Sequence, residues 1–261
     1  MSEKLDLLNI SLYNKDFRIL NGLNLSLSPG KFTAIIGPNG AGKSSLLKIL
    51  SGECRSYTGH IHWGKRNWIG LSDKEMSTQR AMLRQQFHMT FSFEVSDILE
   101  MGRYPHQKSN AYNQSIIQEV MACLQLENLL HKSYHTLSGG EQQRVQLGRV
   151  LAQIWDAPKE AILLLDEPVS ALDIRYQHQL LHMLQKLAAE KGWLVLAVLH
   201  DLNQVMQYAD EVVLMKKGTI VSSGKPMEVM TPENLKESYH IHASWINHEE
   251  FSLPTIKIQY V

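Results

Sequence analysis

Residues 32–50 read Phe-Thr-Ala-Ile-Ile-Gly-Pro-Asn-Gly-Ala-Gly-Lys-Ser-Ser-Leu-Leu-Lys-Ile-Leu, and this stretch predicts a strand, a tight loop and a helix. The apolar, β-branched run at 32–36 is typical of a buried strand, and the loop fits the pattern Gly-x-x-x-x-Gly-Lys-Ser. In such a loop the backbone N–H groups turn toward a polyphosphate, and the dipole of the following helix favours the anion. We therefore expect this segment to bind a nucleotide.

The loop also offers side chains for the phosphates. Lys43 is placed to reach the β- and γ-phosphates, and the Ser44 hydroxyl to hold Mg²⁺. The alternative is a glycine-rich turn without a ligand, but the strand before the loop and the helix after it favour nucleotide binding. The residues expected to contact the nucleotide here are Gly37, Pro38, Asn39, Gly40, Ala41, Gly42, Lys43, Ser44 and Ser45.

The overall composition excludes several classes of protein. The 261 residues carry 26 basic and 26 acidic side chains, which argues against a nucleic-acid partner bound through a basic face. Cys54 and Cys123 lie far apart, so we expect a reducing compartment and no disulfide framework. The charged start predicts no ordinary secretory signal. No apolar run approaches the ~20 residues that span a bilayer, so another chain would have to do the spanning.

Hydrophobic periodicity divides the chain into segments. Residues 23–28 alternate between apolar and polar, which predicts an antiparallel strand. Helical periodicity from 87 to 151 predicts an all-helical insert. Two apolar runs at 161–165 and 194–199, separated by an amphipathic helix, predict a parallel sheet covered on both faces. We therefore expect one α/β domain over residues 1–261, with a nucleotide-binding core at 1–86 and 152–261 and a helical subdomain at 87–151.

Two adjacent carboxylates follow the apolar run at 161–165. Because ligands bind at the carboxyl ends of strands in open α/β sheets, Asp166 and Glu167 are expected to face the nucleotide. Asp166 is suited to orient Mg²⁺, and Glu167 to polarise the water that attacks the γ-phosphorus. His200, after the next strand, is suited to contact the γ-phosphate. The alternative for the two acids is a solvated turn or a helix cap, and the alternative for the histidine is that His200 or Asp201 caps the helix at Leu202.

A second anion site is predicted at residues 137–144, Leu-Ser-Gly-Gly-Glu-Gln-Gln-Arg. A serine and two glycines at the start of a helix offer N–H groups and a hydroxyl to a phosphate. A capped helix with a glycine turn explains any three of these residues but poorly explains all eight.

Together these segments resemble the ATP-binding subunits of ABC transporters, and the resemblance covers nearly the whole chain. It rests on residues 37–44, 137–144, 162–167 and 170–173 (Ser-Ala-Leu-Asp), and on His200, in that order. The resemblance implies a P-loop NTPase fold of the RecA-like type, with an N-terminal antiparallel β subdomain and an inserted α-helical subdomain. It also implies hydrolysis of ATP with Mg²⁺ by a head-to-tail homodimer. The residues implied to contact ATP across the dimer are Leu137, Ser138, Gly139, Gly140, Glu141 and Asp173.

Further roles follow from the same resemblance. Tyr13 resembles the aromatic residue that stacks on adenine, with core packing as the alternative. Gln85 resembles the Q-loop glutamine that contacts Mg²⁺ and links the core to the helical insert, and Gln86 is the alternative register. Ser45 and Val169 stand where threonine is usual, but neither position supplies the metal-binding hydroxyl or the base.

Within that family, residues 101–106, Met-Gly-Arg-Tyr-Pro-His, resemble a segment of the subunits that serve importers of iron chelates, haem and vitamin B12. Residues 151–160 are similar to the corresponding stretch in haemin importers. The resemblance implies two permease subunits, a periplasmic cargo-binding protein and a place at the cytoplasmic face of the bacterial inner membrane. Haemin is the implied cargo, and a ferric siderophore or cobalamin are the alternatives.

Two rival classes remain to be weighed against the importer. A soluble mechanical ATPase acting on nucleic acid or ribosomes generally has tandem cassettes or a long coiled coil, and a small-molecule kinase lacks the segment at 137–144.

His178 and His182 lie at helical spacing, and we interpret them as part of a solvated helix face and not as a haem site.

Overall fold

The computed structural model describes residues 3–68, 72–85, 91–157, 159, 161–247 and 253–259. Its centre is a six-stranded sheet with five parallel strands. In spatial order the strands are β10 (Thr219–Gly224), β9 (Glu211–Lys216), β3 (Phe32–Ile36), β8 (Leu194–Val198), β7 (Ile162–Asp166) and β6 (Arg80–Leu83). Strand β10 is antiparallel to β9 and closes one edge.

Both faces of this sheet are buried, which explains why its strands are continuous apolar runs. On β7, Leu163 and Leu165 face a core shared with the helical part of the chain. Ile162 and Leu164 face a second core with the helix α1 (Lys43–Leu50) and the antiparallel sheet. The expected α/β fold with a parallel sheet covered on both sides is confirmed.

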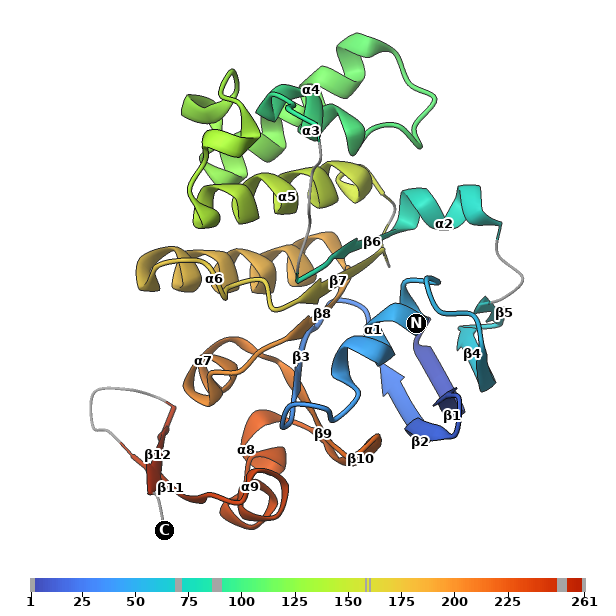
Figure 1. Ribbon diagram of the computed structural model, residues 1–261, viewed down its shortest axis with the longest axis vertical. Coiled ribbons are helices and arrows are strands. Elements are labelled where there is room, and N and C mark those ends of the chain that lie inside the picture. Colours follow the sequence, from blue (N-terminus) through green and yellow to red (C-terminus); the bar gives the residue numbers. More distant parts are fainter. Residues whose placement is uncertain are drawn as a thin grey trace.

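The antiparallel sheet lies beside α1 (Figure 1) and has the order β2-β1-β4-β5. Its strands are β1 (Leu5–Asn14), β2 (Phe17–Leu27), β4 (Tyr57–Trp63) and β5 (Arg66–Asn67). The alternation at residues 23–28 belongs to β2, where the leucines are buried and the polar residues between them are exposed. The expected N-terminal antiparallel subdomain is therefore present.

Helices cover the other end of the molecule (Figure 1). They are α2 (Asp73–Gln79), α3 (Val95–Met101), α4 (Asn110–Leu124) and α5 (Gly139–Ile154), with short 3₁₀ turns at Glu127–Leu129 and Tyr134–Thr136. Helix α5 continues three residues past the expected boundary at 151 because Ala152 and Ile154 are still buried in the core. Residues 86–90, at the expected start of the insert, and Pro158 and Glu160 lie outside the described residues.

The remaining elements follow the sheet toward the C-terminus. Helix α6 (Ile174–Lys191) contains the expected amphipathic segment, and α7 (Leu202–Tyr208) follows β8. Helices α8 (Pro226–Val229) and α9 (Pro232–Tyr239) lead to a separate hairpin of β11 (His242–Ile246) and β12 (Thr255–Gln259). In the described part of the chain, no helix is both long enough and apolar enough to cross a bilayer.

Candidate functional site

The phosphate-binding loop lies between β3 and α1 and packs closely on its neighbours. At Gly37 the backbone has φ +146°, and a β-carbon there would lie 2.1 Å from the carbonyl oxygen of Met215. At Gly42, the N-cap of α1, φ is +96° and a β-carbon would lie 2.6 Å from Leu20 Cδ2. Glycine is required at both positions because any side chain would push the loop off β9 and β2. The loop geometry thus fits the sequence pattern that predicted it.

Lys43 is buried inside this loop. Its ammonium donates hydrogen bonds to the carbonyl oxygens of Gly37, at 2.6 Å, and Pro38, at 3.0 Å. Burial lowers the pKa of Lys43, and the nearby carboxylates of Glu167 and Asp166 oppose that shift. The cation is thus held at the centre of the loop, where it can exchange carbonyl oxygens for phosphate oxygens.

The magnesium ligands expected from the sequence are brought together across 122 residues of chain. Ser44 Oγ donates to Asp166 Oδ1 at 3.1 Å. Burial, and then the charge of Glu167, raise the pKa of Asp166, so the site favours a cation. A hydroxyl and a carboxylate oxygen are ligands that Mg²⁺ accepts, usually together with water and phosphate oxygens. The pair therefore fits Mg²⁺, which when bound would neutralise charge on the nucleotide phosphates.

Glu167 has a backbone conformation that is uncommon for a residue with a side chain. Its φ is +54°, in the left-handed region, directly after the last residue of β7. Its carboxylate accepts two hydrogen bonds of 2.8 Å, one from Gln85 Nε2 and one from His200 Nε2. Gln85 and His200, predicted from separate motifs, thus both contact the carboxylate of Glu167, which was predicted from a third. Gln86, the alternative to Gln85, lies outside the described residues.

A cavity of about 610 Å³, the nucleotide cavity, brings Lys43 and Ser44 together with Glu167 and its two partners, while the predicted residues Gly37, Pro38 and Asp166 are not among its described lining residues. The described residues that line it are Ile19, Asn39, Gly40, Ala41, Gly42, Lys43, Ser44, Ser45, Gln85, Glu167 and His200. Tyr13 is not among them: its side chain is 49% exposed, and the Arg18 guanidinium carbon lies 5.2 Å from the centre of its ring. Stacking of Tyr13 on adenine therefore stays a prediction. Sequence reasoning missed Ile19, which reaches the cavity because β2 runs against the loop at Gly42.

The signature segment, residues 137–144, begins α5, and its start is a capped helix, the arrangement that the sequence offered as the alternative to an anion site. The Ser138 hydroxyl accepts a hydrogen bond from the Glu141 N–H at 3.3 Å, and the Glu141 carboxylate accepts one from the Ser138 N–H at 2.8 Å. The Ser138 hydroxyl also donates to the Glu141 carboxylate at 2.8 Å, and the hydrogen bonds that this carboxylate accepts from the Ser138 N–H and hydroxyl lower the pKa of Glu141. Among the described residues that line the nucleotide cavity, none comes from 137–141. Within one chain the two anion sites are therefore separate.

Gln143 joins α5 to the turn after β7, a role that sequence reasoning missed. Its Nε2 donates to the Glu167 carbonyl oxygen at 3.0 Å, and its Oε1 accepts from the Ala171 N–H at 3.0 Å. Asp173, two residues after Ala171, caps α6 because its carboxylate accepts a hydrogen bond from the Tyr176 N–H at 3.0 Å. No local pattern marks such a bridge, because the contacts form only when α5 packs on this turn.

The two histidines interpreted as a solvated face differ from each other. His182 is exposed, but His178 Nδ1 lies 2.8 Å from the Tyr208 hydroxyl, and the two rings are 5.7 Å apart. For His178 the interpretation is wrong, because α7 packs on that side of α6.

Comparison with known proteins gives consistent matches. The family model described as ABC transporter matches residues 20–170. The hemin import ATP-binding protein HmuV of Shewanella denitrificans is 39% identical over 248 residues, which cover 95% of this chain and 97% of that protein. HmuV of Escherichia coli O157:H7 is 42% identical over 223 residues, covering 85% of this chain and 86% of that protein.

Solved structures agree with these sequence matches. An inward-facing conformation of a metal-chelate type ABC transporter is 28% identical and superposes with a TM-score of 0.83, covering 100% of this chain and 98% of that one. The dimeric structure of a bacterial ABC transporter cassette is 26% identical with a TM-score of 0.75, covering 85% of this chain and 98% of that one.

Proposed function

We propose, given that this chain belongs to the ABC transporter family, that it is the ATP-hydrolysing subunit of a bacterial haemin importer. One observation carries the hydrolytic part of this proposal: the Glu167 carboxylate, held by Gln85 and His200, lies in the same cavity as Lys43 and Ser44. The sequence identity of about 40% to proteins named for hemin import supports haemin as the cargo.

Each side chain has a chemical task in this proposal. Lys43 holds the β- and γ-phosphates, and Ser44 with Asp166 holds Mg²⁺. Glu167 is the general base that polarises the attacking water, since its carboxylate lies in the cavity and is oriented by two hydrogen bonds. His200 orients this base and, because it lines the same cavity, would also contact the γ-phosphate. Gln85 connects the base to the helical part of the chain.

The catalytic centre is proposed to be completed by a second copy of the chain. The nucleotide cavity lacks the Ser138 segment among its described lining residues, although that segment has the N–H groups suited to a γ-phosphate. In a head-to-tail homodimer the segment of each copy would close over the ATP of the other. Binding of two ATP molecules would then shift the population toward the closed dimer, and hydrolysis would reopen it.

A groove near Gln85 is the proposed docking site for the permease. It has a volume of about 400 Å³ and is lined by residues from the turn after α1, from α2, from β6 and the residue after it, and from α5. Arg80, Arg84 and Arg149 contribute to its walls, and Arg84 pairs with Glu53 at 3.0 Å. Three arginines stand against the one carboxylate of Glu53 in the described lining, and this excess of positive charge favours a permease segment with acidic or carbonyl oxygens. Two permease subunits, fed by a periplasmic cargo-binding protein, would hold the homodimer at the cytoplasmic face of the inner membrane.

The cargo is tested in cells that lack the chromosomal copy of this subunit and receive it on a plasmid. We expect uptake of iron from haemin to depend on the plasmid and to fail with Glu167→Gln. Uptake of ferric siderophore and of cobalamin should not depend on it. If uptake of ferric siderophore or of cobalamin depends on the plasmid copy and uptake of haemin does not, the alternative importers are favoured. Co-purification with ribosomes or DNA, in place of a permease, would contradict the importer assignment.

A further inference from the structure

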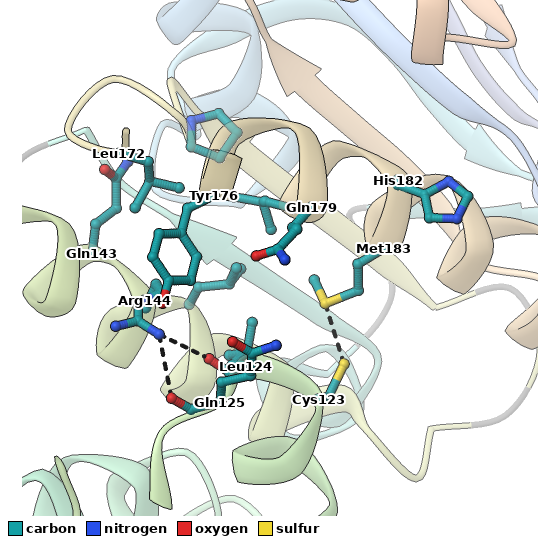
Figure 2. Close-up of a pocket in the computed structure, with 13 residues that line it drawn as sticks. Cys123, Leu124, Gln125, Gln143, Arg144, Leu172, Tyr176, Gln179, His182 and Met183 are labelled. Carbon is teal, nitrogen blue, oxygen red and sulfur yellow. Dashed lines mark hydrogen bonds between the residues drawn. The ribbon is translucent and has the colours of Figure 1, made fainter. Parts of the chain in front are cut away.

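A second cavity, of about 190 Å³, lies between the helical part of the chain and the core. Its walls come from the end of α4, from α5, from the turn after β7 and from α6. Figure 2 shows these side chains converging on a common space from the two sides. The cavity is distinct from the nucleotide cavity, because the two share no described lining residue.

The body of this second cavity is apolar. Leu124, Leu147 and Leu180 line it and are each less than 10% exposed. At one end Cys123 Sγ lies 3.2 Å from Met183 Sδ, and burial raises the pKa of the Cys123 thiol. This end is therefore neutral and suited to packing against a hydrocarbon or aromatic ring.

One wall of the second cavity carries a fixed cation. Arg144 Nη1 donates to the carbonyl oxygens of Leu124 and Gln125, both at 3.3 Å, and the guanidinium carbon lies 4.5 Å from the centre of the Tyr176 ring. A guanidinium has five N–H donors, and the described contacts of Arg144 with hydrogen-bond acceptors use only Nη1. The remaining donors can serve a carboxylate.

Volume and chemistry together define the ligand. A cavity of about 150 Å³ with apolar walls accommodates benzene, so this slightly larger space fits one ring with a small substituent. We propose that the second cavity is a regulatory site for a small monocyclic aromatic acid. Its ring packs against Leu147 and Leu180, and its carboxylate accepts hydrogen bonds from Arg144.

Gln143 couples this site to hydrolysis. It lines the second cavity, and its amide holds both the Glu167 carbonyl oxygen and the Ala171 N–H. A bound ring also fills the space between the helical part and the core, and so fixes their relative position. On the proposed function, the helical part of one copy closes over the ATP of the other, so a ligand that fixes the helical part against the core lowers the rate of ATP turnover without touching the nucleotide cavity.

Benzoate is the probe, and benzylamine is its cationic counterpart of similar size. Binding to the full chain without nucleotide is measured by ligand-observed NMR, and turnover by phosphate release. We expect benzoate to bind with a Kd of about 1 mM, as its size allows, and benzylamine not to bind. Saturating benzoate should lower kcat about fivefold and leave the KM for ATP unchanged.

Two tryptophan substitutions on α6 test whether benzoate binds in the second cavity or elsewhere on the chain. Gln179 is exposed at the cavity, so Gln179→Trp covers the opening at little risk to folding and should abolish both benzoate effects. Lys186→Trp, about two turns further along the exposed side of α6, should retain both. Undiminished benzoate binding by Gln179→Trp, equal binding of benzylamine, or binding without a change in kcat would each overturn the proposal. The NMR measurement of benzoate binding does not depend on ATP hydrolysis. Failure of the benzoate site can therefore be distinguished from failure of the proposed function.

Discussion

The ion pair between Arg103 and Asp156 is expected to make a measurable, pH-dependent contribution to stability. Arg103 is 3% exposed and its Nη1 and Nη2 donate to the two carboxylate oxygens of Asp156, at 2.7 and 3.0 Å. Its Nη1 also donates to the Ala152 carbonyl oxygen at 2.6 Å. These bonds fasten the segment at 101–106 to the end of α5.

The pKa of Asp156 gives the magnitude. Burial alone raises the pKa of this carboxyl, but the hydrogen bonds and charge of Arg103, with a contribution from His106, outweigh burial and leave it at about 2 against an ordinary 3.8. A difference of that size corresponds to about 2 kcal/mol of stability. Because the folded-state pKa is the lower one, this stability is present above the unfolded-state value and is lost as the pH falls toward 2.

We therefore expect Asp156→Asn to lower the free energy of unfolding by at least about 2 kcal/mol at pH 7, since Arg103 is left buried without its counter-charge. The difference between wild type and variant should shrink to about half by pH 3. Urea unfolding followed by tryptophan fluorescence at several pH values measures both. Glu190→Gln, on the exposed side of α6, is the control and should change stability by less than about 0.5 kcal/mol. A wild-type-to-variant difference that stays constant from pH 7 to pH 3 would refute the reasoning.

Three further predictions concern the nucleotide cavity. Glu167→Gln should keep ATP binding, lower kcat by about 10²-fold or more, and accumulate a closed dimer in size-exclusion chromatography with ATP; near-normal turnover would contradict its role as the base. Lys43→Ala should weaken ATP binding by about tenfold or more in a fluorescent-nucleotide titration, because a charge-assisted phosphate contact is lost, and unchanged affinity would contradict that contact. Gly37→Ala should reduce both thermal stability and ATP affinity, because its β-carbon would lie 2.1 Å from the Met215 carbonyl oxygen; a variant with the wild-type melting temperature would show that the loop has room there.

The sequence was sufficient to predict site residues where a reactive or metal-binding side chain lies just after an apolar run typical of a strand. The apolar run that became β3 leads into the glycine-rich loop before Ser44, and the run that became β7 ends in Asp166, so both residues could be assigned to one site by the rule that ligands bind at strand ends. In the same way, the carboxylate after β7 and the histidine after β8 could be assigned to one site before their 2.8 Å contact was seen.

Other features were not predictable because they depend on how distant segments pack. Ile19 lines the nucleotide cavity only because β2 lies against the loop, and Tyr13, one strand over, does not line it. Gln143 looks like an ordinary helix residue until α5 is placed on the turn after β7. Arg103 and Asp156 are 53 residues apart, and nothing in either local sequence shows that they pair.

The proposed head-to-tail homodimer requires two copies of the chain to complete each catalytic centre, because the Ser138 segment of a copy is not among the described residues that line its own nucleotide cavity. Mixing two inactive variants tests this most directly: Lys43→Ala, which damages the loop, and Ser138→Arg, which damages the signature segment. In a mixed dimer one centre carries both defects and the other carries none, so we predict that mixing restores ATP hydrolysis to about a quarter of the wild-type rate. If the mixture hydrolyses no more ATP than the two variants do separately, the centres are not shared between copies and the account is wrong.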